Sequence, residues 1–264
     1  MINACDIKLK ARCNLVDDIS KDFYDVQQFF MNVGVEFWIM SGSVLGAILE
    51  GGMLSGDRDI DVGIYEVDAK KIRENLGLLE SIGFKCKQRL DPLTFELKNM
   101  ITLERNVPID IKIYTKKNDK YVRNIHKSNG IFSGLLWEII DLYSVVAVNE
   151  QSALQRRLPL ISRIISALGK FTPMKIRGLI VRLMCKIWCA GKVEYGHEEV
   201  NKKYIDEKIE HVFLGVPVNI PRDYHEYLTE EYGVDYFISK EDYSNKGGWK
   251  KKSHKVTSRY CYSK

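Results

Sequence analysis

The stretch from Ser41 to Ile64, SGSVLGAILEGGMLSGDRDIDVGI, joins a turn of small residues, a short apolar segment and three aspartates at alternate positions. The aspartates are Asp57, Asp59 and Asp61, and the chain becomes apolar directly after them. Carboxylates this close together repel one another unless a positive charge lies between them. The stretch therefore predicts a cation that the sequence itself does not supply.

A second run supports this interpretation. Side chains alternate along a β-strand, so Asp59 and Asp61 project from one face while their apolar neighbours enter the core. The later run PIDIKIY, residues 108–114, repeats the pattern with Asp110 and Lys112 on its polar face. If the two strands pair, three carboxylates form a site for a hard divalent cation such as Mg²⁺. The alternative is that the acids form the solvated face of an edge strand.

The residues upstream of the aspartates favour the cation site. A Gly-Ser turn that leads into a short helix can present backbone N–H groups and a hydroxyl to a phosphate. Gly42 and Ser43 form such a turn, and the apolar residues 44–50 after it predict a short helix. A phosphate-facing turn beside an acidic strand is more specific than the acidic strand alone.

Apolar periodicity predicts an α/β (α+β) fold, with a mixed sheet flanked by helices. Helices are expected at 14–32, 44–50, 68–80 and 224–232, the last ending at Gly233, and strands at 35–40, 59–64, 84–90, 94–98 and 108–114. The small residues Ser41–Ser43 are expected to form a turn.

Residues 151–192 differ from the rest of the chain because they contain nine basic residues and no acidic one. Their apolar residues keep a helical period, with breaks near Gly169 and Pro173, so we expect a hairpin of two basic amphipathic helices. One interpretation is a hairpin packed on the core with a solvated basic face. The other is a surface that rests on anionic lipid. Nucleic acid is disfavoured, because the segment has few interleaved aromatic residues.

The composition is that of an ordinary globular protein, with 45% apolar and 28% charged residues in a chain of 264. The six cysteines form no CxxC pair and no disulfide framework. The N-terminus lacks the apolar run of a signal peptide, and no apolar stretch reaches the roughly 18 residues that span a bilayer. We therefore expect a cytoplasmic protein, with peripheral contact at the cytoplasmic face of the membrane if the hairpin binds lipid.

The Gly-Ser turn, short helix and acidic strand together resemble the nucleotidyltransferase superfamily typified by DNA polymerase β. Within it, the LicD family, which includes fukutin and fukutin-related protein, typically carries G-T-L-L-G-A-V-R-x-x-G-x-x-P-W-D-D-D-I-D. Residues 42–61, GSVLGAILEGGMLSGDRDID, align with that run without a gap. Residues 213–233, FLGVPVNIPRDYHEYLTEEYG, are similar to a second family segment, vP-x-x-y-x-x-yL-x-x-x-YG.

The chain departs from the family pattern at a few positions between the helix and the acids. Leu49 stands where arginine is usual, Ser55 and Gly56 where Pro-Trp is usual, and Arg58 where another aspartate is common. These departures leave the expected metal ligands in place and bear on the identity of the donor.

The resemblance implies a metal-dependent phosphotransferase of cell-surface polysaccharide synthesis. Such an enzyme moves a phosphorylated small group, for example phosphocholine or ribitol phosphate, from a CDP-linked donor to a sugar hydroxyl. Asp59 and Asp61 would bind Mg²⁺ or Mn²⁺, and Asp110 would either bind the metal or accept the proton of the acceptor hydroxyl. Asp57 would be a fourth ligand.

The resemblance also implies how the donor is held. Gly42 and Ser43 would lie against the donor phosphates. Lys112 would pair either with a phosphate or, more simply, with a neighbouring acid.

We expect residues 1–150 to form the catalytic core, 151–200 a basic helical insertion, and 201–264 a segment that completes the core and ends in a basic tail. Two other functions remain open. One is nucleotidyl transfer to a small molecule or a protein. The other is a catalytically inactive relative that binds membrane or nucleic acid through its basic segments.

Overall fold

The computed structural model describes residues 4–90, 97–128, 159–189 and 193–234, with the short pieces 135–136, 139–140, 143 and 236–237. The chain forms two compact units. The first comprises Met1–Phe84, Leu103–Tyr121 and Val200–Ser253, and the second comprises Lys85–Thr102, Val122–Glu199 and His254–Lys264. The division at 1–150, 151–200 and 201–264 stays a prediction.

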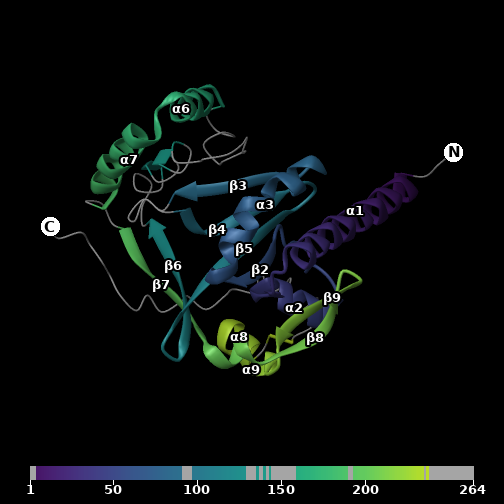
Figure 1. The fold of residues 1–264 in the computed structure, drawn as a ribbon. Helices are drawn as coiled ribbons and strands as arrows, with labels where there is room; N and C mark the ends of the chain where they lie inside the picture. Colours follow the sequence, from purple (N-terminus) through teal and green to yellow (C-terminus); the bar gives the residue numbers. More distant parts are fainter. Residues whose placement is uncertain are drawn as a thin grey trace. The chain divides into compact units, whose positions relative to one another are not determined.

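The first unit is built on a mixed sheet in which β2 (Ile60–Tyr65) lies between β1 (Phe37–Ile39) and β5 (Pro108–Lys117) (Figure 1). The strand β1 runs antiparallel to β2, and β5 runs parallel to it. Alternate residues of β2 and β5 are buried, namely Ile60, Val62, Ile64, Ile109, Ile111 and Ile113. Because side chains alternate between faces, the aspartates between these residues lie on the other face of the sheet. The predicted α/β class with a mixed sheet and flanking helices is confirmed.

All four predicted helices belong to this unit, and the first three are α1 (Ala4–Val33), α2 (Ser41–Glu50) and α3 (Ala69–Ser81), the last preceded by a 3-10 turn at Glu66–Asp68. The helix α1 buries Phe23 and Phe30 against Phe37 of β1, with ring centroids 6.5 and 4.8 Å apart. These buried aromatic residues fix α1 on the sheet, as the apolar period of 14–32 predicts.

The helix α2 begins three residues earlier than predicted, because Ser41–Ser43 form its first turn and not a separate loop. The carbonyl of Met40 accepts the backbone N–H of Ser43 at 2.9 Å. Ser41 has a φ of 49°, which residues other than glycine rarely adopt. Its N–H donates to the hydroxyl of buried Tyr227 at 2.9 Å. A contact distant in sequence therefore stabilises the start of this helix.

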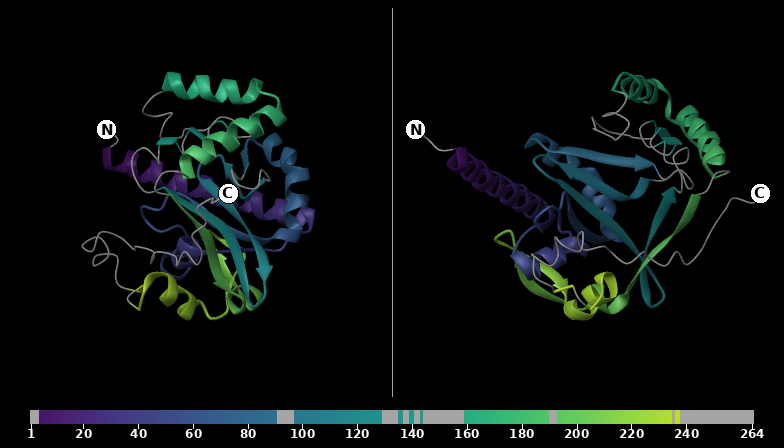
Figure 2. Two further views of the ribbon diagram at one scale, coloured as in Figure 1. Left: turned by 90° about the vertical axis from the view of Figure 1, so that its left-hand side faces the viewer. Right: turned by 180° about the vertical axis from the view of Figure 1, so that it is seen from behind.

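The C-terminal part of the first unit contains α8 (Lys202–Asp206), a hairpin of β8 (Lys208–Phe213) and β9 (Val216–Pro221), and α9 (Tyr224–Tyr232) (Figures 1 and 2). The hairpin turn consists of Leu214 and Gly215, with φ values of 53° and 76°. Two positive φ values suit the type I′ turn that joins twisted strands. The helix α9 ends at Gly233 as predicted, but the hairpin before it was not predicted.

The second unit contains most of four strands and two helices. The strand β3 (Lys85–Leu90) neighbours β4 (Leu97–Glu104), and β6 (Lys120–Ser128) neighbours β7 (Val193–Asn201). The helices α6 (Pro159–Phe171) and α7 (Met174–Cys189) confirm the predicted hairpin, which breaks at Thr172 and Pro173. Neither is long and apolar enough to cross a membrane, nor is any other helix in the described ranges. The basic tail at 245–264 lies outside the described residues.

Candidate active site

The sheet register brings two of the predicted ligands together. Asp61 of β2 and Asp110 of β5 are directly opposite each other in the parallel pair. Both side chains are partly buried, while the residues on either side of each are fully buried. Because the two strands pair in this register, both carboxylates lie on the same face of the sheet, as the alternating pattern predicts.

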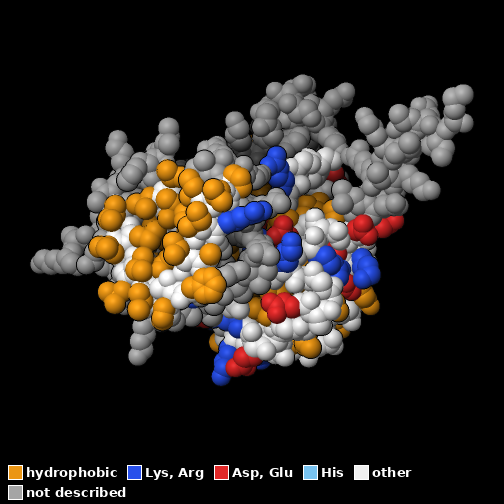
Figure 3. Space-filling view, turned by 90° about the horizontal axis from the view of Figure 1, so that it is seen from above, with side chains coloured by type: hydrophobic (Ala, Val, Ile, Leu, Met, Phe, Trp, Pro, Cys, Tyr) orange, Lys and Arg blue, Asp and Glu red, His pale blue; other side chains and the backbone are white. Residues whose placement is uncertain are grey.

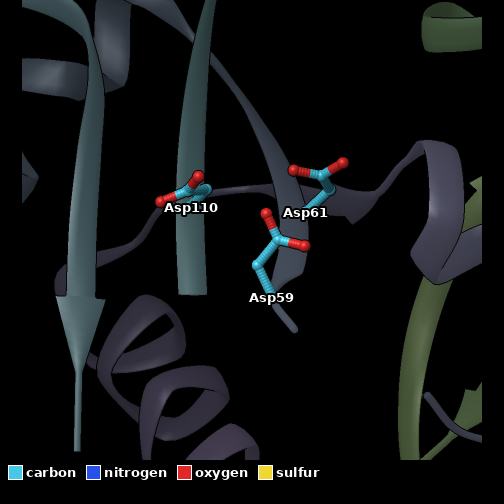
Figure 4. A group of neighbouring side chains, drawn as sticks. All are labelled: Asp59, Asp61 and Asp110. Atoms are coloured by element: carbon cyan, nitrogen blue, oxygen red, sulfur yellow. The ribbon is translucent and has the colours of Figure 1, made fainter. Parts of the chain in front are cut away.

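Asp59 joins these two residues from the loop just before β2, because the strand begins at Ile60. Each of the three aspartates offers a carboxylate oxygen that lies within 4.8 Å of the oxygens of the other two. Figure 4 shows the carboxylates of Asp59, Asp61 and Asp110 converging, with Asp110 on the neighbouring strand. Asp59 is the exposed member of the group. The predicted trio is thus brought together, and Asp57 is not part of it.

Lys112 occupies the same face of β5 as Asp110, two residues further along. Its Nζ lies 2.7 Å from Oδ1 of Asp61, and the two side chains are only 11% and 16% exposed. A shielded ion pair of this kind holds both groups in fixed positions. Lys112 therefore neutralises part of the charge of the site and orients Asp61, which is the simpler of its two predicted roles.

The first turn of α2 is tied directly to the acidic strand. The backbone N–H of Asp61 donates to Oγ of Ser43 at 2.8 Å, and the N–H of Met40 donates to the carbonyl of Asp61 at 3.0 Å. Ser43 is 3% exposed. The hydroxyl of Ser43 thus accepts a hydrogen bond from the backbone of β2. A contact between this hydroxyl and a donor phosphate stays a prediction. The bond explains why a small hydroxyl residue suits this position.

Gly42 makes room for the fourth predicted acid. A β-carbon on Gly42 would lie 2.7 Å from Oδ2 of Asp57, which is closer than real contacts allow. Asp57 therefore lies against the first turn of α2, where the positive end of the helix dipole favours a carboxylate. It also accepts the backbone N–H of Arg58 at 3.2 Å. The predicted contact of Gly42 with a donor phosphate remains a prediction.

Two tyrosines of α9 belong to the surroundings of the site and were not predicted there. The hydroxyl of Tyr227 binds the backbone of Ser41, and that of Tyr232 would lie 4.0 Å from a β-carbon on Gly42. Partial burial raises the pKa of Tyr232, and the charges of Glu231 and of the nearby aspartates add to this shift. The only sequence signal was the similarity of residues 213–233 to a family segment.

Partial burial and crowding raise the pKa of two of these acids. Partial burial, followed by the charges of Asp61, Asp110 and Asp57, raises the pKa of Asp59 from 3.8 to about 6, against the opposing effect of Lys112. Partial burial likewise raises the pKa of Asp57. A cation among these oxygens would favour the ionised form of Asp59 and offset the repulsion from the neighbouring acids.

The raised pKa of Asp59 predicts a pH dependence of both stability and metal affinity. Folded Asp59 keeps its proton from its ordinary pKa of 3.8 up to about 6, so the metal-free protein loses stability as pH rises through this window. Metal affinity should move in the opposite direction, because the proton competes with the ion. We expect Mn²⁺ binding, measured by titration calorimetry, to strengthen by up to about tenfold per pH unit below about pH 6 and to level off above it.

The variant Asp59→Asn provides the control for this experiment. It cannot release a proton at position 59, so its residual Mn²⁺ binding should depend much less on pH. An unchanged pH profile in this variant would show that another group controls the titration.

Comparison with known proteins identifies the domain that carries this geometry. Residues 34–133 match the family model of the LicD/FKTN/FKRP nucleotidyltransferase domain. The matched segment contains α2, the acidic trio and Lys112. The predicted resemblance to the LicD family is confirmed over these residues.

Two curated relatives are uncharacterized proteins of Rickettsia. RT0683 of Rickettsia typhi is 24% identical over 102 residues, which cover 39% of this chain and 30% of that protein. RP689 of Rickettsia prowazekii is 24% identical over 98 residues, which cover 37% of this chain and 34% of that protein. The chain thus spans about a third of the length of these relatives. Their names indicate no activity.

A solved structure also shows similarity, namely the solution structure of the antibiotic-resistance factor ANT(2'')-Ia. It has 11% sequence identity and a TM-score of 0.30, covering 66% of this chain and 94% of the other. We draw nothing further from a similarity this low.

Proposed function

We propose that this chain, whose residues 34–133 match a LicD-type nucleotidyltransferase domain, is a metal-dependent phosphotransferase that acts in glycan modification. It moves a phosphorylated small group, such as phosphocholine or ribitol phosphate, from a CDP-linked donor to a hydroxyl of a cell-surface glycan. The main support is the convergence of Asp59, Asp61 and Asp110 beside the first turn of α2.

The chemistry of these side chains suits a divalent cation. Mg²⁺ and Mn²⁺ prefer oxygen ligands, and carboxylates supply both the ligand atoms and the compensating charge. Asp59, Asp61 and Asp110 offer three such oxygens within 4.8 Å of one another. The ammonium of Lys112 lies 2.7 Å from Asp61, and partial burial followed by the charges of the other acids still raises the pKa of Asp59 to about 6 against the opposing effect of Lys112. The site therefore holds an excess of negative charge that a cation would balance.

Each residue has a definite role under this proposal. Asp59 and Asp61 hold the ion, and Asp110 either completes the ligand set or accepts the proton of the acceptor hydroxyl. A bound divalent cation supplies the charge that orients the donor diphosphate and stabilises the departing nucleotide. Lys112 pairs with Asp61 and orients its carboxylate. The first turn of α2, with Gly42, is the proposed contact for the donor phosphates.

A second candidate is nucleotidyl transfer, since the matched family model describes a nucleotidyltransferase domain. It would use the same acids and break a different bond. Attack at the outer phosphorus of a CDP-linked donor releases cytidine monophosphate, whereas nucleotidyl transfer from a nucleoside triphosphate releases pyrophosphate.

The products of two donor panels distinguish these functions. The full chain is incubated with Mn²⁺ or Mg²⁺, glycan acceptors and either CDP-linked donors or nucleoside triphosphates, and the products are identified by mass spectrometry. We expect cytidine monophosphate and an acceptor that has gained the phosphorylated group. Pyrophosphate with a nucleotidylated product would establish the second candidate. Absence of any metal-dependent product from both panels would contradict both, and would favour an inactive relative.

A further inference from the structure

The helix α6 carries a row of exposed apolar side chains. Its large exposed apolar residues are Leu160, Ile161, Ile164, Leu168 and Phe171, from 47% to 88% exposed. At 3.6 residues per turn they fall within about 100° of the helix circumference and form one continuous stripe. The inward contact is made from a different side, where Ile165 packs on buried Tyr143. The apolar face of α6 therefore points into solvent.

The helix α7 repeats this arrangement. Ile176, Leu179, Ile180, Leu183 and Ile187 are 37% to 68% exposed and again fall within about 100° of arc. Val181, on another side of the helix, is fully buried with Ile140 and Tyr143. Figure 3 shows hydrophobic side chains gathered into a broad patch on this face of the molecule, with Lys and Arg side chains next to it. Contiguous exposed apolar surface rimmed by basic residues is typical of an interaction site.

The charge of the segment indicates what covers this patch. Residues 151–192 contain nine basic residues and no acidic one, and six of the nine belong to α6 and α7, so the two helices carry a net positive charge. Arg163 is exposed on α6 beside the apolar stripe, where its stem can lie along the apolar surface and its guanidinium can reach a phosphate. Aliphatic stripes flanked by basic residues are typical of helices that lie in the interface of an anionic membrane.

The same charge argues against a second copy of this chain on the patch. Two identical faces would bring two positive segments together without an acidic residue in either to compensate. The helices also have the wrong length to cross a bilayer, since 13 and 16 residues are fewer than the roughly 20 that a span requires. They are long enough to lie flat on its surface.

We propose that the α6–α7 patch, formed by the ten exposed apolar residues named above, binds the surface of a membrane that contains anionic lipid. The apolar stripes enter the boundary between headgroups and acyl chains, and the basic residues contact lipid phosphates. This binding requires neither the acidic trio nor any transferase activity.

Co-sedimentation of the full chain with vesicles tests the proposal. The protein should bind vesicles of phosphatidylcholine mixed with phosphatidylglycerol, bind phosphatidylcholine alone much less, and dissociate as salt rises. Phe171→Ser combined with Leu179→Ser should weaken binding by a factor on the order of ten or more. Both side chains are exposed, at 88% and 68%, so the fold should not depend on them. Val67→Ser with Val234→Ser, at 82% and 68% exposed, is the matched control and should bind normally.

Fluorescence quenching tests whether the apolar stripe enters the bilayer. The chain already has four tryptophans, so the signal is the fluorescence that each substitution adds to that of the unchanged chain. Lipids with brominated acyl chains should quench the fluorescence added by Phe171→Trp and leave that added by Val67→Trp unaffected. Equal binding by the Phe171→Ser/Leu179→Ser variant, or binding without quenching, would overturn the proposal in favour of purely electrostatic attraction. A dimer in solution that this variant abolishes would assign the patch to a second copy instead.

Asp59→Asn should bind vesicles like the unchanged chain, so failure of the transferase proposal would leave this one intact.

Discussion

Replacing Asp59 with asparagine is expected to abolish metal-dependent transfer while leaving the fold intact. Asp59 is the exposed member of the trio, and its carboxylate lies within 4.8 Å of those of Asp61 and Asp110. Asparagine keeps the shape and removes the charge that would hold the ion. We expect turnover to fall by a factor on the order of a thousand or more, because the site loses both a ligand and part of its affinity for the metal.

The stability of the same variant provides an independent readout. Partial burial and the charges of the other acids raise the pKa of Asp59, so its ionised form is disfavoured in the metal-free protein. Asp59→Asn should therefore be at least as stable as the unchanged chain without metal, and it should lose the rise in melting temperature that Mn²⁺ produces. Asp17→Asn, an exposed acid on α1, is the matched control. Near-normal turnover in Asp59→Asn would contradict the assigned role.

Replacing Gly63 with alanine is expected to give the largest loss of stability of any such small change in β2. Gly63 lies opposite Trp38 in the antiparallel pair β1–β2, and a β-carbon at position 63 would lie 2.4 Å from two atoms of the indole ring. Trp38 is only 1% exposed, so its ring lies within the packed core. We expect a loss of about 3 kcal/mol in the free energy of unfolding, measured by urea denaturation.

Gly77→Ala is the matched control for this prediction. Gly77 lies inside α3, and a β-carbon there meets nothing within 4 Å. The substitution should stabilise the protein by about 0.5–1 kcal/mol, because alanine favours the helix. Equal effects of the two substitutions would show that helix and strand propensity, and not the contact with Trp38, sets the cost at position 63.

The acidic site could be predicted because it depends on short-range rules. Alternation along a strand places Asp59 and Asp61 on one face, and the same alternation in residues 108–114 places Asp110 and Lys112. Alternation alone does not show that these two strands pair with each other. If the apolar side of each strand is buried, a parallel pair has few registers other than the observed one, in which Asp61 lies opposite Asp110.

The parts that were missed depend on contacts distant in sequence. The early start of α2 depends on the hydroxyl of Tyr227, which lies 186 positions from Ser41. No local pattern reveals such a partner. The proximity of Tyr232 to the acids also depends on contacts distant in sequence, since the β8–β9 hairpin and α9 reach the site only after folding.

The hairpin of α6 and α7 shows a different limit. Helical period and charge predicted both helices, and they could not decide between a hairpin packed on the core and one facing a membrane. Periodicity reveals that a helix has an apolar face and not what covers it. The exposure of residues such as Phe171 and Leu160, at 88% and 70%, shows that this apolar face is not packed on the core.

The central claim is that Asp59, Asp61 and Asp110 together hold a divalent cation. Anomalous diffraction from crystals soaked in Mn²⁺ tests it most directly. We predict one strong anomalous peak within bonding distance of all three carboxylates, and its loss in Asp59→Asn crystals. Crystals that contain manganese elsewhere and none among these three side chains would contradict the claim.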